Sequence, residues 1–205
     1  MKLYLSSYYF GDHPTDFSNL IGDNKKVAII MNATDISPSD KHSIYLDREV
    51  AKMAELDLDA EELDLRQYFD NNDNLGAKLN EYGAVWVMGG NTFVLRRAMK
   101  QSSFDKLIVE KIKDDSIIYG GFSAGSCVTS RTLHGIELID NPNEIAEGYD
   151  TDVIWDGLGL IDYSIVPHFN SEHKESVVMN DVVKYFIDNN LPYKTLRDGE
   201  AIVIK

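Results

Sequence analysis

The sequence predicts an α/β fold built on a doubly wound, mostly parallel sheet. Short apolar runs rich in valine, isoleucine and tyrosine alternate along the chain with segments whose apolar residues recur at helical spacing. Several of these runs are continuously apolar rather than alternating with polar residues, which is typical of parallel strands buried on both faces. Strands that alternate with helices in this way favour a sheet covered by helices on both sides.

The first part of the chain supplies most of the predicted elements. The apolar run AVWVMGG is followed by a predicted helix at 92–100, and we expect Thr92 to cap this helix. The strands are predicted at 2–8, 26–33, 62–66 and 84–90, and the helices at 37–56, 77–83, 92–100 and 104–113.

The second part continues the pattern around one long polar segment. Strands are predicted at 116–121 and 163–169, a helix at 171–188 and a terminal hairpin at 194–205, with a long loop at 139–157. Repeats, low-complexity segments and linkers are not evident in the sequence. We therefore expect residues 1–205 to form one domain.

Composition narrows the classes of partner. The chain carries 34 acidic and 20 basic residues, a formal net charge of −14, so its average surface repels nucleic acids and anionic membranes. A single cysteine, Cys127, excludes an internal disulfide, and we interpret it as a small buried apolar residue. Without a signal-like or membrane-spanning apolar run, we expect a cytoplasmic protein.

Residues 121–125, GFSAG, form the clearest candidate for a reactive site. They fit the G-x-S-x-G pattern of a nucleophile elbow, in which a tight turn between strand and helix exposes a serine hydroxyl. Ser123 would be the nucleophile, and the amide of Ala124 would help to stabilise an oxyanion. The alternative is that these small residues merely allow a helix to pack closely on a strand.

A serine nucleophile needs a base, and His168 is the preferred candidate among five histidines. It follows the apolar strand YSIVP, so it is expected at a strand end beside the elbow. His173 is the nearest competitor. We expect it to face solvent from the following helix.

The turn LRDGEAI at 196–202 offers two acids to orient the base, Asp198 and Glu200. With Asp198 the order of the triad along the chain would be serine, histidine, acid. An esterase of the α/β-hydrolase kind would instead need an acid between the serine and the histidine; Asp140, Asp150 and Asp156 are available there.

A second oxyanion donor is predicted in the turn GGNTF at 89–93, because Gly89 and Gly90 permit a close approach of the backbone. The alternative is an ordinary turn that leads into a helix cap. The segment lacks the glycine spacing and the lysine of a phosphate-binding loop.

Four motifs, GGNTF, GFSAG, GLGLIDYSIVPHF at 157–169 and LRDGEAI, together resemble the peptidase E and cyanophycinase family of serine peptidases. The resemblance implies a flavodoxin-like three-layer fold similar to class I glutamine amidotransferases. It also implies that Ser123, His168 and Asp198 form the triad, although the family's acid is usually glutamate. The oxyanion donors would be the amides of Gly90 and Ala124, with no metal or organic cofactor.

The resemblance implies a dipeptidase-like enzyme that acts on small peptides. Peptidase E cleaves dipeptides with N-terminal aspartate, and an arginine-rich segment after the histidine belongs to that type; here 170–181 reads NSEHKESVVMND, without arginine. Arg131 and Arg197 are alternative candidates for holding a substrate carboxylate. The alternative functions are a non-catalytic ligand-binding or sensor protein on the same fold, and an esterase.

Overall fold

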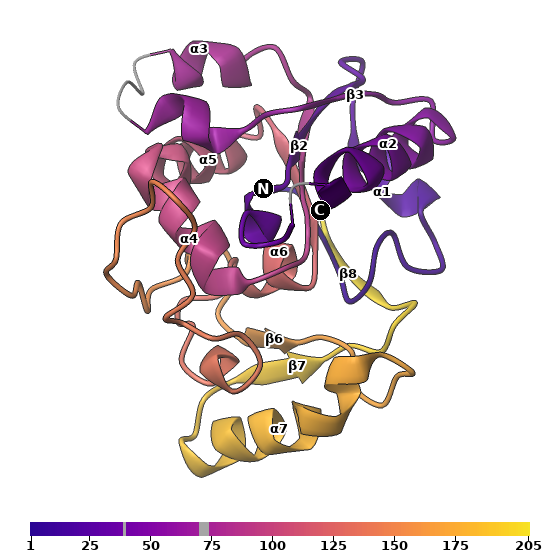
Figure 1. Cartoon of the computed structure of the whole chain (residues 1–205). Coiled ribbons are helices and arrows are strands. Elements are labelled where there is room, and N and C mark those ends of the chain that lie inside the picture. Colours follow the sequence, from indigo (N-terminus) through magenta and orange to yellow (C-terminus); the bar gives the residue numbers. More distant parts are fainter. Residues whose placement is uncertain (39, 70–73) are drawn as a thin grey trace.

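The computed structural model of this chain describes residues 1–38, 40–69 and 74–205 (Figure 1). A central sheet stands between two layers of helices, and a smaller unit of two strands and one helix lies beyond one end of the sheet. The predicted α/β fold with a mostly parallel sheet is confirmed.

Six strands of the described chain form the central sheet in the order β3-β2-β4-β5-β1-β8. Neighbouring strands from β3 to β1 are parallel, and the edge strand β8 runs antiparallel to β1. The strands are β1 (Leu3–Ser6), β2 (Lys26–Ile30), β3 (Asp59–Glu62), β4 (Ala84–Val87), β5 (Ile118–Phe122) and β8 (Ala201–Ile204).

Both faces of this sheet are buried, which explains the continuous apolar runs. Along β4, Val85 packs into the core under α3, α4 and α5, whereas Trp86 points to the opposite core under α1 and α2. The helices are α1 (Thr15–Leu20), α2 (Asp40–Ala54), α3 (Leu75–Leu79), α4 (Thr92–Gln101), α5 (Phe104–Lys113), α6 (Ala124–Cys127) and α7 (Met179–Asp188). Within the described ranges, no helix combines the length and hydropathy needed to cross a bilayer.

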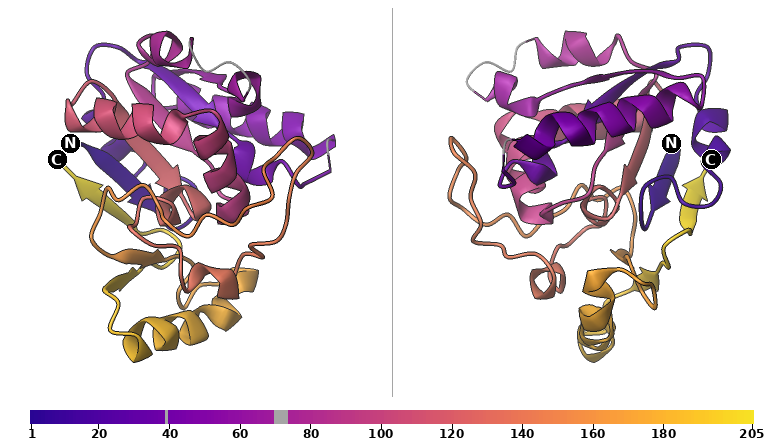
Figure 2. Two further views of the ribbon diagram at one scale, coloured as in Figure 1. Left: turned by 90° about the vertical axis from the view of Figure 1, so that its left-hand side faces the viewer. Right: turned by 45° about the vertical axis from the view of Figure 1, so that its right-hand side comes forward.

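The strand predicted at 163–169 exists but lies outside the central sheet. Strand β6 (Ser164–Val166) pairs in parallel with β7 (Tyr193–Thr195), and α7 covers this small sheet (Figure 2). Val166, Met179 and Phe186 form its separate apolar cluster. The residues after β6 therefore reach the rim of the central sheet from a second structural unit.

The predicted terminal hairpin at 194–205 is wrong. Its two arms pair with different sheets, because β7 joins β6 whereas β8 joins β1. Gly199, at a φ of 101°, lies in the turn between them, where the chain passes from the small sheet to the large one. Asp198 consequently lies where the two sheets meet.

Several predicted boundaries shift for identifiable local reasons. Strand β3 ends at Glu62, where the predicted strand at 62–66 begins, and Asp64 then caps the 3-10 turn Leu65–Tyr68. Asn91, not Thr92, caps α4, since its side chain accepts hydrogen bonds from the amides of Phe93 and Val94.

Two predicted helices are shorter than expected. The helix at 171–188 divides into the 3-10 turn Lys174–Val178 and α7, and the helix at 77–83 is represented by α3. The helix predicted at 37–56 corresponds to α2, and residue 39 of that prediction lies outside the described residues. The other short 3-10 turns are Asn32–Thr34 and Ile136–Leu138.

The polar segment 139–157 has little regular structure but is held firmly by a buried arginine. Arg97, on α4, is 1% exposed and donates hydrogen bonds to the carbonyl oxygens of Pro142, Glu144 and Asp152. A buried guanidinium needs such acceptors. The loop is thereby fixed over the end of α4, next to the residues described below.

Candidate active site

Ser123 occupies a strained turn between β5 and α6. Its φ of 49° and ψ of −115° are unusual for a residue with a side chain, as expected for a nucleophile elbow. A Cβ on Gly125 would lie 2.1 Å from the carbonyl oxygen of Val87, so close packing also requires glycine here. The small residues of the motif thus allow the close packing of α6 on the sheet. Helix α6 has only four residues, so its dipole is small. Its free amides would therefore contribute more than the dipole to stabilising an oxyanion.

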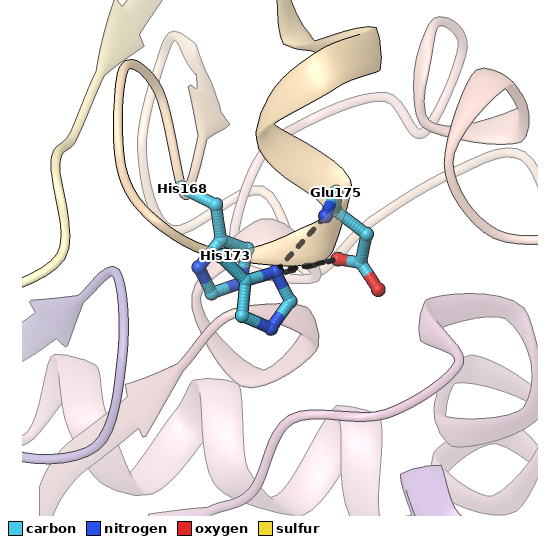
Figure 3. Close-up of side chains that lie close together, drawn as sticks. All are labelled: His168, His173 and Glu175. Carbon is cyan, nitrogen blue, oxygen red and sulfur yellow. Dashed lines mark hydrogen bonds and ion pairs between the residues drawn. The ribbon is translucent and has the colours of Figure 1, made fainter.

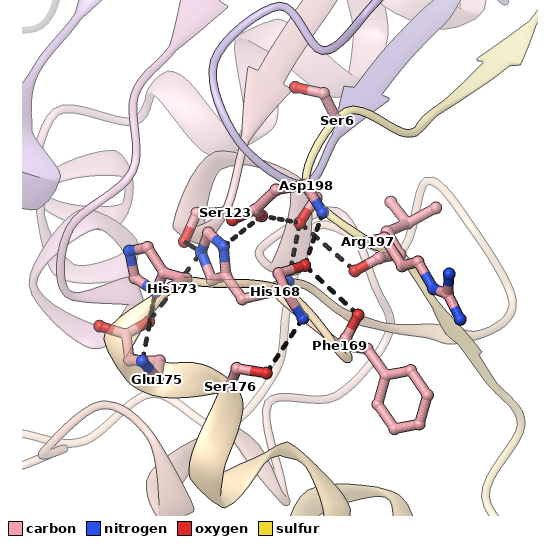
Figure 4. Close-up of polar contacts among 12 residues, drawn as sticks. Ser6, Ser123, His168, Phe169, His173, Glu175, Ser176, Arg197 and Asp198 are labelled. Carbon is pink, nitrogen blue, oxygen red and sulfur yellow. Dashed lines mark hydrogen bonds and ion pairs between the residues drawn. The ribbon is translucent and has the colours of Figure 1, made fainter.

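His168 and Asp198 complete a hydrogen-bonded row with Ser123 (Figure 4). The Nε2 atom of His168 lies 3.2 Å from Ser123 Oγ, and Nδ1 lies 2.7 Å from Asp198 Oδ1. A carboxylate at Nδ1 assigns the proton to that nitrogen and leaves the Nε2 lone pair facing the serine. The three residues that the sequence singled out are thus brought together.

Ser7, which was not predicted, joins the histidine to the acid. It lies just beyond β1; its hydroxyl donates to Asp198 Oδ1 at 2.8 Å and accepts from the backbone amide of His168 at 2.7 Å. Asp198 is also held by its own amide, which donates to Ser171 Oγ at 2.8 Å. Glu200 instead accepts from the Arg197 amide and so stabilises the turn.

Burial determines the protonation of the imidazole. His168 is 1% exposed, and this burial lowers its pKa below the ordinary 6.5, although Asp198 opposes the shift. His168 is therefore neutral at neutral pH. A neutral imidazole with a free Nε2 can accept a proton from the serine hydroxyl.

The turn after β4 lies directly against the serine. A Cβ on Gly89 would come within 3.0 Å of Ser123 Cβ, and Gly90 has a φ of 144° with the Ala33 carbonyl 2.4 Å from where its Cβ would be. Among the described residues, neither the amide of Gly90 nor that of Ala124 donates a hydrogen bond. Both amides remain available to a ligand.

A cavity of about 450 Å³ opens in front of Ser123 and His168. Its charged lining consists of Arg48, Lys174, Asp140, Glu144 and Glu175. Burial, together with the nearby Glu175 and Glu144, raises the pKa of Asp140 to about 6. Asp140 accepts a hydrogen bond from the Thr92 amide and so is not a partner of His168.

His173 lies in the cavity, and the expectation that it faces solvent is wrong. Its ring stacks on that of His168 at 3.8 Å with an interplanar angle of 16° (Figure 3). Tyr8 packs edge-on against His168. His173 is held there because its Nδ1 accepts from the Glu175 amide at the start of the 3-10 turn. The sequence offers no pattern that would have indicated this stacking.

His168, His173 and Glu175 have potential metal-ligand atoms within 4.8 Å of one another. The two imidazole rings are nearly parallel, however, so their in-plane lone pairs do not converge on one point. A tetrahedral ion would require one ring to rotate. This arrangement fits stacking better than metal binding.

The other candidates lie away from the serine. Arg131 is paired with Asp162 on the surface, and the side chain of Arg197 points away from His168 (Figure 4). Cys127 is buried, as expected, and burial raises the pKa of its thiol.

Known proteins resemble the chain over its whole length. It is 29% identical over 207 residues to an uncharacterized peptidase, Lin0382, of Listeria innocua, covering 100% of this chain and 92% of that protein. It is 30% identical to the uncharacterized peptidase Lmo0363 of Listeria monocytogenes, covering 90% and 85% of the two chains.

A solved structure shows the same fold. The crystal structure of a candidate peptidase E protein from Listeria monocytogenes EGD-e superposes with a TM-score of 0.73 at 25% identity, covering 100% of this chain and 98% of that one. The model of peptidase family S51 matches residues 5–205. This chain therefore belongs to peptidase family S51 and is a serine-type peptidase.

Proposed function

We propose that this chain hydrolyses small peptides through an acyl-enzyme on Ser123. The observation that carries the proposal is the row of hydrogen bonds from Asp198 through His168 to Ser123. A strained serine beside a buried, neutral imidazole is the arrangement that nucleophilic acyl transfer needs.

In the first half-reaction, Ser123 Oγ attacks the peptide carbonyl carbon while His168 Nε2 takes the hydroxyl proton. The tetrahedral oxyanion accepts hydrogen bonds from the amides of Gly90 and Ala124. His168 then gives its proton to the leaving amine as the C–N bond breaks, and the acyl group remains on Ser123.

In the second half-reaction, water replaces the amine. His168 takes a proton from the water as its oxygen attacks the acyl carbon, and the same proton returns to Ser123 Oγ when the ester bond breaks. Asp198 keeps the imidazole in the required tautomer and stabilises the imidazolium that forms in each half.

The size of the cavity favours a small substrate. Its volume of about 450 Å³ lies toward the lower end of the range usual for small-ligand pockets, about 300–1,000 Å³. The name of a relative in Drosophila melanogaster, probable alpha-aspartyl dipeptidase, supports a peptide of dipeptide size. The alternative of a non-catalytic sensor gives no reason for an acid–base–serine row, and the order serine, histidine, acid disfavours an α/β-hydrolase esterase.

The test compares hydrolysis of a dipeptide library by the parent protein and by Ser123→Ala. We expect the variant to lose about 10⁴-fold or more in kcat, as for other serine nucleophiles. Ser18→Ala is the matched control, because this serine is half-buried on α1 and its hydroxyl donates to the Thr15 carbonyl of its own helix. Equal rates for parent and Ser123→Ala would refute the proposal.

A further inference from the structure

Arg48 is a cation built into the wall of the catalytic cavity. It projects from α2, and its guanidinium lies over the ring of Tyr9 at 4.3 Å and near that of Tyr45 at 5.3 Å. The Tyr9 ring in turn packs 5.1 Å from that of Phe122, the residue that precedes Ser123. Arg48 is thus connected to the nucleophile through two packed aromatic rings.

A fully buried carboxylate holds one edge of this guanidinium. Glu49 is 0% exposed; its Oε1 accepts from Arg48 Nε at 3.3 Å and Nη2 at 3.2 Å, while its Oε2 accepts from Trp86 Nε1 at 3.0 Å. Burial raises the pKa of Glu49, and the contacts with Trp86 and Arg48 oppose this shift. Burying a carboxylate is costly, so its use here to orient an arginine indicates that the orientation matters.

The rest of the guanidinium is available to a ligand. Two stacking contacts and Glu49 fix its plane and its Nε edge, and Arg48 Nη1 has no hydrogen-bond partner among the described residues. A planar guanidinium with free donors matches the geometry of a carboxylate. Lys174, the other cation of the cavity, is 84% exposed and lies 4.0 Å from Glu175, so it is far less organised.

We propose that Arg48 binds a carboxylate of the peptide substrate and so determines specificity. This proposal rests on the proposed function, since the carboxylate is bound in the cavity that contains Ser123. It can belong to an acidic side chain of the residue that acylates Ser123 or to the free C-terminus of a dipeptide. Segment 170–181 contains no arginine for this role and offers only the exposed Lys174.

Three substrates separate the two sources. Aspartyl-p-nitroanilide carries a side-chain carboxylate alone, alanyl-alanine a terminal carboxylate alone, and alanyl-p-nitroanilide neither. Arg48→Gln should lower kcat/KM about 10- to 100-fold for the substrate whose carboxylate is bound, the range for a charge-assisted hydrogen bond, and change alanyl-p-nitroanilide less than about threefold. Arg48→Lys should recover part of the loss.

Two further variants control for charge and folding. Lys52→Gln removes the same charge one turn along α2, from a side chain that pairs with Glu55 in solvent, and should leave all three rates unchanged. The double variant Arg48→Gln/Glu49→Gln removes the buried carboxylate together with its partner, so it avoids an unpaired buried charge and should show the same selective loss.

Binding without turnover separates this proposal from the proposed function. In the Ser123→Ala background, calorimetry with aspartyl-alanine should show at least a tenfold weaker Kd when Arg48→Gln is added. If Ser123→Ala hydrolyses as fast as the parent, the mechanism fails, yet the rates of Arg48→Gln on the three substrates still decide the role of Arg48. An equal Kd with and without Arg48→Gln, or an equal loss of rate on all three substrates, would overturn the proposal.

Discussion

The site consists of two halves built in different ways. Ser123 and the Gly90 turn follow β5 and β4, neighbouring parallel strands of the central sheet, whose carboxyl ends meet at one rim. His168 and Asp198 follow β6 and β7, the two strands of the small sheet. Each half is thus a pair of loops at the ends of two parallel strands, and the sheets themselves are separate.

The two halves differ in the interactions that hold their catalytic groups in position. In the first half, backbone packing holds the serine and the oxyanion amides, because the glycines leave no room for side chains. In the second half, side-chain hydrogen bonds hold the base and the acid, and Ser7 at the end of β1 joins that half to the central sheet. Substitutions that add volume should therefore impair the first half most. Substitutions that remove polar groups should impair the second half most.

The largest effect should come from removing the acid of the second half. Asp198→Asn keeps the shape but cannot hold the imidazole proton on Nδ1, so we expect kcat to fall about 10³- to 10⁴-fold in steady-state assays. Glu200→Gln is the matched control two residues away and should retain activity within about threefold, because Glu200 contacts the Arg197 amide. A larger fall in kcat from Glu200→Gln than from Asp198→Asn would show that the triad acid is misassigned.

Adding one methyl group to the first half should have the next largest effect. Gly90→Ala places a Cβ 2.4 Å from the Ala33 carbonyl oxygen at a φ of 144°, so the turn must shift and its amide must move. Loss of one oxyanion donor predicts a fall in kcat of about 10²- to 10³-fold. In Gly22→Ala the new methyl group meets nothing within 4 Å, and this variant should match the parent in kcat. Unchanged kcat in Gly90→Ala would exclude its amide from the oxyanion site.

Cutting the link between the halves should have a moderate effect. Ser7→Ala removes a donor to Asp198 and an acceptor for the His168 amide, so we expect about a tenfold lower kcat. Leaving a buried amide unpaired should also lower the free energy of unfolding by about 1–3 kcal/mol in urea titrations. If Ser7→Ala lowers stability but leaves kcat unchanged, the two halves are aligned without this hydroxyl.

The smallest effect is a shift of the acid limb of the pH profile. Since burial lowers the pKa of His168, kcat/KM should stay high as the pH falls to 6.5 and decline below it, as the base takes up a proton. The folded-state pKa lies below the unfolded one, so the stability contributed by neutral His168 is present above pH 6.5 and lost as the pH falls through the folded-state value. A decline of kcat/KM centred above pH 6.5 would contradict this assignment.

The sequence predicted the first half of the site better than the second. Continuous apolar runs ending in glycines were enough to place Ser123 and Gly90 at strand ends on one rim of the sheet, because parallel sheets leave little freedom there. His168 was expected on a strand of the same sheet. Its true position depends on how α7 and β7 pack on β6, which is long-range information that local patterns lack.

The residues that were missed act through tertiary contacts. Ser7 and Arg48 occur in segments with no motif. Ser7 acts through Asp198, 191 residues away, and the guanidinium of Arg48 packs on Tyr9, which lies outside α2. His173 was misplaced because a helix pattern over 171–188 concealed the turn that brings it onto His168. The single-domain organisation stays a prediction.

The most direct test of the account is whether His168 activates Ser123. A fluorophosphonate probe reacts quickly with a serine only if a base removes its proton, and mass spectrometry of the digested protein identifies the labelled residue. We predict rapid labelling at Ser123 in the parent protein and labelling slower by about 10³-fold or more in His168→Ala. Equal labelling rates in the two proteins, or labelling at another residue, would contradict the central claim.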